Sequence, residues 1–328
     1  MRIFILFRES VIVVGKRKVD VAIDEIGRVI YGKREVVELL LIGMIARGHV
    51  LLESVPGSGK TKLAKSFAKV IDGTFSRIQF TPDVLPSDVT GIQFFNPKTQ
   101  EFELRKGPVM TNVLLADEIN RATPKTQSSL LEVMEEHQTT IDGETFSIQS
   151  PFIVIATQNP VESNHGTFPL PEAQLDRFLF KVDMGYPSEE EERDIMRAYL
   201  TEEPLDALQS TLTPEDLVSM QEEVKEVHIA DVVNDYLLRL VRVSREHTDI
   251  ELGISTRGAL ALMRATQARA YLRGRSYVSP EDVKSLVPYV FEHRLILSMQ
   301  ASIQKTPTEV VNDLLNSVEV PVESGART

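Results

Sequence analysis

The sequence has no cysteine and no tryptophan, and only 6% of its 328 residues are aromatic. Without cysteine, the chain can form neither disulfide bonds nor thiolate metal sites. Long hydrophobic runs are also missing, because Arg8 and Glu9 separate Ile3–Phe7 from Val11–Val14 and neither run can span a bilayer. No small-residue cleavage site follows these runs, as a signal peptide would require. We therefore expect a cytoplasmic protein without a membrane span.

Positive charge is scarce as well. The chain has 36 Lys and Arg against 48 Asp and Glu, which gives a formal net charge of −12. Tight binding to nucleic acid needs a basic surface, so nucleic acid is not an expected partner of the isolated chain. The six histidines are scattered without the spacing of metal ligands. The length is sufficient for two domains, each with its own core.

A glycine-rich loop between an expected strand and an expected helix is the main motif. Val50–Leu52 is typical of a buried strand, and apolar residues recur at helical spacing from Lys60 onward. Gly57 and Gly59 lack a Cβ, so successive backbone N–H groups can close around a phosphate at the helix N-terminus. Lys60 can reach the β- and γ-phosphates, and the Thr61 hydroxyl can ligate Mg²⁺. The predicted nucleotide-binding residues are Pro56, Gly57, Ser58, Gly59, Lys60 and Thr61.

This loop departs from the G-x-x-x-x-G-K-[ST] pattern at one position. Ser54 stands where the pattern has its first glycine, and Pro56-Gly57 can supply the turn instead. An ordinary glycine-rich surface loop is the alternative that the motif alone leaves open.

Further strands are expected along the chain, separated by helical patterns. They are Phe75–Phe80, Val113–Ala116, Phe152–Ala156 and Phe178–Val182. Such alternation predicts a parallel α/β sheet with both faces covered. Ligands of these sheets bind at the carboxyl ends of the strands, so the polar residues at those ends are the candidates for function.

Two carboxylates follow the third expected strand. Asp117 could hold Mg²⁺, directly or through water, and Glu118 could polarise an attacking water molecule. A solvated carboxylate pair at a strand end is the simpler alternative. The position of the pair downstream of a phosphate-binding loop favours the catalytic interpretation.

Asn159 and Arg177 are two weaker candidates near the fourth and fifth expected strands. The Asn159 amide could hydrogen-bond the γ-phosphate or the lytic water, although an Asn before a Pro is also ordinary turn chemistry. A lone arginine beside Asp176 is more often a partner in a salt bridge than a catalytic group, which is the alternative for Arg177.

Two short inserted hairpins are expected as well. Ile92–Phe95 and Glu101–Arg105 flank a plausible turn, and Gln138–Ile148 contains the strong turn signal Asp142-Gly143. Beyond Tyr186-Pro187 the pattern is almost wholly helical, and Ser188 begins it with a capping box. We therefore divide the chain into an unassigned extension, an α/β domain with two hairpins, a helical domain and a tail, at residues 1–18, 19–187, 188–306 and 307–328.

Several segments together resemble the MoxR family of AAA+ ATPases. They are Ser54–Thr61, Leu114–Lys125, Ala156–Pro160 and Leu170–Phe178, and residues 81–83 and 85–88 also match that family's pattern. The resemblance implies an α/β fold, an AAA+ P-loop domain with a parallel sheet and helices on both faces, followed by an all-α lid domain. It also implies sensor 1 at Asn159, an arginine finger at Arg177 and sensor 2 at Arg257.

The resemblance further implies an ATPase that requires ATP and Mg²⁺ and works as a ring, expected to be a hexamer, in chaperone-like remodelling of a protein client. Partners in that family often carry a von Willebrand factor A domain, and the hairpins are expected at the pore of the ring. Two alternatives remain open. A small-molecule kinase could use the same phosphate-binding loop, and a nucleic-acid motor of related build would have basic hairpins. The second hairpin has no Lys or Arg, whereas Lys98 and Arg105 leave the first undecided.

Overall fold

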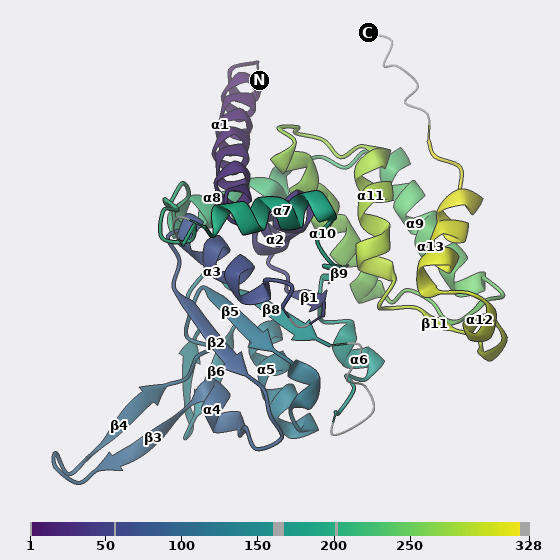
Figure 1. Ribbon diagram of the computed structural model, residues 1–328. Coiled ribbons are helices and arrows are strands. Elements are labelled where there is room, and N and C mark those ends of the chain that lie inside the picture. Colours follow the sequence, from purple (N-terminus) through teal and green to yellow (C-terminus); the bar gives the residue numbers. More distant parts are fainter. Residues whose placement is uncertain (1, 56, 160–166, 201–202, 322–328) are drawn as a thin grey trace. The chain divides into compact units, whose positions relative to one another are not determined.

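The computed structural model describes residues 2–55, 57–159, 167–200 and 203–321 (Figure 1). Pro56 of the predicted loop and Pro160 of the family pattern lie outside the described residues. The chain forms two compact units. We call Lys18–Ser219 the sheet unit, and Met1–Arg17 together with Met220–Thr328 the helical unit.

A five-stranded sheet with the strand order β2-β5-β8-β1-β9 lies at the centre of the sheet unit. All of its neighbouring strands run parallel. The strands are β1 (Val50–Glu53), β2 (Phe75–Gln79), β5 (Val113–Asp117), β8 (Ile153–Gln158) and β9 (Phe180–Asp183). The predicted parallel sheet is confirmed, and it brings the ends of β1, β5 and β8 to one edge.

Helices cover both faces of this sheet because its strands are apolar on both sides. On one face, Leu114 of β5 and Val154 of β8 share a buried cluster with Leu130 of α5. On the other face, α2 approaches closely enough that a Cβ on Gly43 would lie 3.2 Å from Val50 and 3.5 Å from Ile153. The helices from the N-terminus to this point of the chain are α1 (Arg2–Gly27), α2 (Arg34–Ile45), α3 (Lys60–Val70), α4 (Pro86–Thr90), α5 (Pro124–Glu136), α6 (Glu172–Leu175) and α7 (Glu189–Ala198), of which α7 has no buried residue and does not cover the sheet.

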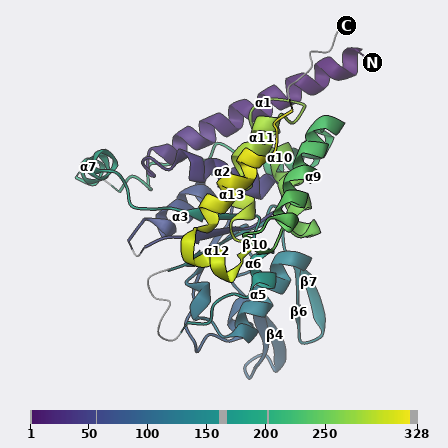
Figure 2. The same ribbon diagram turned by 90° about the vertical axis from the view of Figure 1, so that its right-hand side faces the viewer.

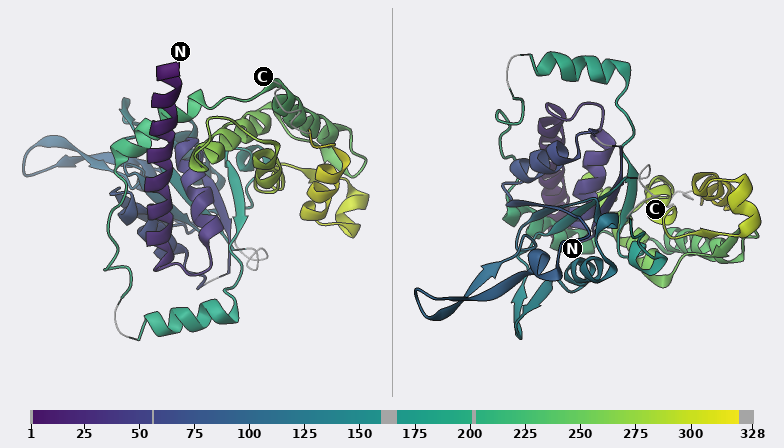
Figure 3. Two further views of the ribbon diagram at one scale, coloured as in Figure 1. Left: turned by 90° about the horizontal axis from the view of Figure 1, so that it is seen from above. Right: turned by 60° about the horizontal axis from the view of Figure 1, so that its bottom comes forward.

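Two antiparallel hairpins are inserted into the sheet unit. The first consists of β3 (Gly91–Asn96) and β4 (Glu101–Lys106), and the second of β6 (Gln138–Ile141) and β7 (Glu144–Ser147). The first hairpin extends away from the sheet, as Figure 3 shows from two sides. The Gln93 N–H donates to the Asp142 carboxylate at 3.2 Å, so the turn of the second hairpin is joined to strand β3 of the first.

The N-terminal residues belong to a helix. Within the described residues, the predicted extension is the first part of α1, which continues to Gly27. Further along this helix, Lys18 forms an ion pair of 2.6 Å with Asp216, and the Glu25 carboxylate accepts from the Gln209 N–H at 3.0 Å. None of the helices in the described ranges is both long and apolar enough to cross a membrane.

The helical unit is mainly α-helical (Figure 2). It contains the 3₁₀ turn η3 (Val224–Glu226) and α9 (Asp231–Glu246), α10 (Thr256–Leu272), α11 (Pro280–Phe291), α12 (Met299–Gln304) and α13 (Pro307–Ser317). This agrees with the predicted helical lid, with one addition. Two very short strands, β10 (Ile250–Leu252) and β11 (Ile296–Leu297), form a small antiparallel sheet. The α13 helix packs on α9 and α11, with Val310 and Leu314 buried, so the first part of the predicted tail is part of this unit.

The compact units divide at Ser219, within α8 (Pro214–Glu223), whereas the domain boundary predicted from the sequence lies after residue 187. Part of the segment after α7 is bound to α3 of the sheet unit. The Lys69 ammonium donates to the backbone carbonyl oxygens of Leu205 and Asp206, both at 2.9 Å. These contacts explain why this segment belongs to the sheet unit. The functional boundary after residue 187 stays a prediction.

Candidate nucleotide-binding site

The glycine-rich loop joins β1 to α3 with the backbone that a phosphate-binding loop needs. Gly57 and Gly59 have φ angles of 84° and 86°, in the left-handed region that side chains disfavour. A Cβ on either residue would meet no described atom within 4 Å, so the backbone angle and not space requires glycine. Gly59 is the N-cap residue of α3, and Lys60 begins the helix. The free N–H groups of the first helical turn therefore lie beside Lys60 and Thr61.

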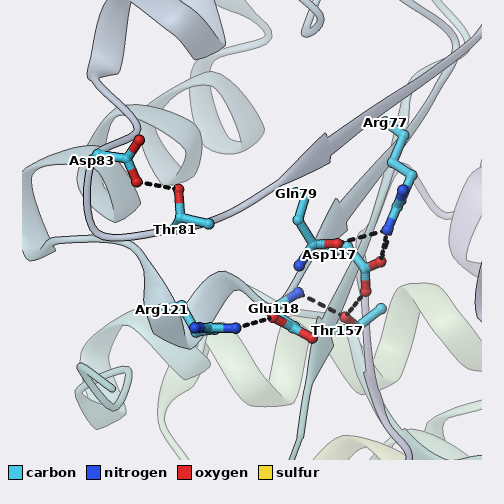
Figure 4. A network of polar contacts seen from close by, with 8 residues as sticks. All are labelled: Arg77, Gln79, Thr81, Asp83, Asp117, Glu118, Arg121 and Thr157. Carbon is cyan, nitrogen blue, oxygen red and sulfur yellow. Dashed lines mark hydrogen bonds and ion pairs between the residues drawn. The ribbon is translucent and has the colours of Figure 1, made fainter. Parts of the chain in front are cut away.

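Asp117 ends β5 and lies in a network of polar contacts (Figure 4). One carboxylate oxygen accepts from the Thr157 hydroxyl at 2.7 Å. The other accepts from Nη2 and Nε of Arg77, at 2.7 and 3.3 Å. Only 9% of the Asp117 side chain is exposed, so this negative charge is held largely out of water with one cation beside it.

Glu118 follows in a left-handed backbone conformation, with φ 56° and ψ 49°. This conformation is unfavourable for a residue with a side chain, and such residues cluster at active sites. Two contacts hold it. The Glu118 N–H donates to the Thr157 hydroxyl at 2.9 Å, and its carboxylate forms an ion pair of 3.1 Å with Arg121. The two carboxylates therefore have different side-chain partners: Asp117 pairs with Arg77, and Glu118 pairs with Arg121.

The glycine-rich loop and the two carboxylates Asp117 and Glu118 line one cavity of about 690 Å³, a size typical of small-molecule sites. The predicted residues that line it are Gly57, Gly59, Lys60, Thr61, Asp117 and Glu118. The other lining residues are Lys62, Lys65, Arg77, Gln79, Glu203 and Leu205. The cavity is thus lined by loop glycines, cations and three carboxylates, which suits a site for a metal–nucleotide complex.

Asn159 lies at the same edge of the sheet. It directly follows β8 and is buried, with 3% of its surface exposed. In the register of β1 with β8, Glu53 is paired with Gln158, and the Ser54 N–H donates to the Gln158 carbonyl at 3.3 Å. The backbone therefore brings Asn159 beside the start of the glycine-rich loop, although it does not itself line the cavity in the described structure.

Arg177 lies at the opposite edge of the sheet. It precedes β9, whose first residue, Phe180, is paired with Val50 at the start of β1. Its guanidinium donates to the Leu131 carbonyl of α5 at 2.9 Å and lies 4.0 Å from the Glu135 carboxylate. Because β1 has four residues, its two ends lie about 10 Å apart. In the described structure Arg177 therefore contacts α5 and does not line the cavity of its own chain.

Arg257 belongs to the helical unit. It is an exposed residue in the first turn of α10, whose N-cap Ser255 accepts from the Gly258 N–H at 3.0 Å. Its role as sensor 2 stays a prediction.

Sequence reasoning missed three polar residues of the site. Arg77 pairs with Asp117, Thr157 bonds both Asp117 and Glu118, and Arg121 pairs with Glu118. Arg121 could have been found, because a position three residues after Glu118 is close enough for an ion pair. Arg77 and Thr157 become partners only through the pairing of β5 with β2 and β8, which no local pattern indicates.

The oxygen ligands fit Mg²⁺. Mg²⁺ in nucleotide sites is held by one or two protein oxygens together with phosphate oxygens and water. Thr61 and Asp117 supply a hydroxyl and a carboxylate on one cavity. In the described ranges, no group of three or more His, Cys, Asp or Glu forms a metal site by itself. A bound metal would thus depend on the nucleotide for its remaining ligands.

The fold and the site together define a P-loop ATPase with a lid. The family model described as "ATPase family associated with various cellular activities (AAA)" matches residues 49–180, and the model of the AAA lid domain matches residues 242–314. More specifically, the chain belongs to the MoxR family of AAA+ ATPases. It is 44% identical to Chaperone MoxR1 of Mycobacterium tuberculosis, over 92% of this chain and 81% of that protein.

Two further relatives match over almost their whole length. The chain is 49% identical to the uncharacterised protein YeaC of Bacillus subtilis, over 93% of this chain and 95% of YeaC. A crystal structure of a candidate ATPase from Cytophaga hutchinsonii superimposes with a TM-score of 0.89, at 38% identity, over 96% of this chain and 98% of that one. The predicted family and the predicted fold are confirmed.

Proposed function

We propose that this AAA+ ATPase hydrolyses the β–γ phosphoanhydride of ATP in a Mg²⁺-dependent reaction. We further propose that it assembles into a ring and uses the energy of hydrolysis to remodel a protein client. The observation that carries the catalytic part is the convergence of Lys60, Thr61, Asp117 and Glu118 on one cavity. These four side chains provide a phosphate-binding cation, two oxygen ligands for a metal and a base.

The residues divide the chemistry among them. The loop N–H groups and Lys60 would bind the phosphates, and Thr61 and Asp117 would hold Mg²⁺, which would supply positive charge beside the phosphates. Glu118 accepts a proton from the attacking water, and Asn159 orients that water. The left-handed backbone of Glu118 turns the chain away from the direction of β5, which supports separate roles for Glu118 and Asp117.

The position of Arg177 supports a ring. Its guanidinium contacts α5 and lies near the edge opposite the cavity of its own chain, so we propose that it acts on a nucleotide held by a neighbouring subunit. There it would stabilise transition-state charge as an arginine finger. We propose a hexameric ring in the cytoplasm, with Arg257 as sensor 2 and a von Willebrand factor A domain protein as partner. The relative named Chaperone MoxR1 supports a chaperone-like role.

The β3–β4 hairpin is the proposed client-contacting element. It carries exposed Phe94, Phe95 and Phe102, and the rings of Phe95 and Phe102 pack edge to face at 5.5 Å. Exposed aromatic groups on a projecting hairpin are suited to contact apolar segments of another polypeptide.

Phosphate release from ATP by the purified chain, in buffer with no acceptor, tests this function. We expect steady release with Mg²⁺ and none in EDTA. ADP formation that occurs only when a small-molecule acceptor is added, with the phosphoryl group recovered on the acceptor and no free phosphate, would identify a kinase instead. Stimulation by DNA or RNA would favour a nucleic-acid motor, for which the basic residues Arg105 and Lys106 at the end of β4 would supply the contact.

A further inference from the structure

Asp117, the proposed metal ligand, is already paired with a cation in this structure. Arg77 reaches it diagonally from β2, because the register pairs Arg77 with Leu115 and Gln79 with Asp117. Two guanidinium nitrogens donate to one carboxylate oxygen, and Nη2 also donates to Gln79 at 2.6 Å. Thr157 occupies the other oxygen. Both oxygens of the carboxylate thus have partners within the chain.

This pairing conflicts with metal binding. A carboxylate that is 9% exposed needs a compensating charge, and Arg77 provides it. A Mg²⁺ ion on the same carboxylate would compensate the charge by itself and would repel the guanidinium. The two cations therefore compete for one ligand, and the buried carboxylate is not left unpaired in either state.

Arg77 has space to move. Its side chain is 43% exposed, and it lines a second cavity of about 640 Å³ at the base of the β3–β4 hairpin. That cavity is also lined by Ser76, Ser87, Asp88, Arg105 and Lys106. Because Arg77 borders both cavities, rotation of its side chain can carry the guanidinium from the nucleotide site to the hairpin base without a change in the backbone.

We propose that Arg77 is an exchangeable counter-charge of Asp117, which pairs with this carboxylate in the nucleotide-free chain and is displaced by Mg²⁺ when the metal–nucleotide complex binds. Arg77 is thus a positioning residue that sets how much Mg²⁺ strengthens nucleotide binding. This inference rests on the proposed function, because it requires a Mg²⁺-dependent nucleotide site.

The test compares binding of a fluorescent ADP analogue with Mg²⁺ and with EDTA. The dissociation constant in EDTA divided by that with Mg²⁺ measures how much the metal strengthens binding. In Arg77→Gln the metal no longer has to displace a charge-assisted hydrogen bond, so the ratio should rise about tenfold. Arg77→Lys keeps the charge and should remain near the wild type. The matched control is Arg105→Gln, which removes one positive charge from the second cavity and should leave the ratio unchanged.

A double-mutant cycle separates this mechanism from simple attraction between Arg77 and the phosphates. In an Asp117→Asn background the two groups no longer form an ion pair, so Arg77→Gln should not change the ratio. Attraction to phosphate would persist in that background. Arg77→Gln should also lower the melting temperature of the nucleotide-free chain, and much less so with Asn at position 117. If Arg77→Gln fails to fold, Arg77→Met is measured in the Asp117→Asn and wild-type backgrounds instead.

An unchanged or lower ratio in Arg77→Gln, or an equal increase in the Asp117→Asn background, would overturn the inference while leaving the proposed ATPase intact. A wild-type chain that binds the analogue equally well with Mg²⁺ and with EDTA would overturn both the metal site and the role of Arg77.

Discussion

The two edges of the sheet both carry buried polar side chains, but the hydrogen-bond and ion-pair partners of these side chains differ between the edges. At the carboxyl edge, Asp117 and Glu118 line a cavity and are paired with Arg77 and Arg121. At the amino edge, His49 is fully buried. Its Nδ1 accepts from the Val154 N–H and its Nε2 donates to the Met134 carbonyl, both at 3.0 Å. The Phe152 ring packs edge-on against it at 5.5 Å.

This difference is the one we expect between a site that binds a ligand and one that holds the fold together. Both nitrogens of His49 are bonded to backbone atoms, so it joins β8 to α5 and has nothing left for a ligand. The carboxyl edge instead presents charged groups to open space, where a ligand can replace their present partners. Changes at the carboxyl edge should therefore affect turnover and binding, whereas changes at the amino edge should affect folding.

The largest expected effect is at Glu118. Glu118→Gln keeps the shape of the side chain but removes the base, so turnover should fall by about 10²–10⁴-fold while ATP binding survives. The melting temperature should change little, because the ion pair with Arg121 is partly exposed. Phosphate release and thermal denaturation measure the two quantities. Near-normal turnover would place the base elsewhere.

Arg177 sharpens the comparison, because it lies at the amino edge and is proposed to act in catalysis. Arg177→Ala should bind ATP normally and lose about 10³-fold in hydrolysis, as other fingers do. Specific activity of the wild type should rise with protein concentration as subunits associate.

A mixing experiment distinguishes the finger from a structural role. Arg177→Ala has an intact nucleotide site and Lys60→Ala has an intact finger, so mixed rings should recover activity. If mass measurements show mixed rings that are no more active than the sum of the two variants, Arg177 does not act in trans. Its contacts with Leu131 and Glu135 would then be its whole role.

The amino edge should show a characteristic pH dependence. Burial lowers the pKa of His49 from 6.5 to about 4, although its hydrogen bond to Met134 opposes this shift. The unfolded chain therefore binds the proton first as the pH falls. The stabilisation that depends on the neutral His49 ring is fully present above pH 6.5. As the pH falls to about 4, the free energy of unfolding decreases by about 3 kcal/mol because of this group.

Denaturant unfolding of wild type and His49→Asn between pH 7.5 and 4 measures this contribution. The variant should be less stable at neutral pH, should lose less stability on acidification, and should retain ATP turnover per folded molecule. An identical pH dependence in the two proteins would show that His49 titrates normally and is not the structural link inferred here.

Local patterns were sufficient to predict the five strands of the sheet and the glycine-rich loop. The apolar run Val113–Ala116 was expected to be a strand and lies in β5, and the loop expected after β1 contains Gly57 and Gly59, whose φ angles are positive. The partners of those residues could not be predicted in the same way. Arg77 meets Asp117 only because β2 lies beside β5, and strand order depends on contacts between distant parts of the chain.

Short elements also escaped prediction. The strands β10 and β11 have three and two residues, too few to show an alternating pattern. The segment after α7 has no apolar periodicity that would assign it to either unit, and its attachment depends on Lys69 meeting two backbone carbonyls. In each case the deciding interaction joins residues that are far apart in the sequence.

The most direct test of the central claim, that the cavity at the carboxyl edge is an ATP site, is calorimetric titration of Mg·ATP in a Glu118→Gln background that prevents turnover. Adding Lys60→Ala should weaken binding by about 1.5–3 kcal/mol, because the phosphates lose a charge-assisted contact. Lys65→Ala, a cation of the same cavity outside the loop, is the matched control and should cost much less. Equal affinity with and without Lys60 would contradict the account.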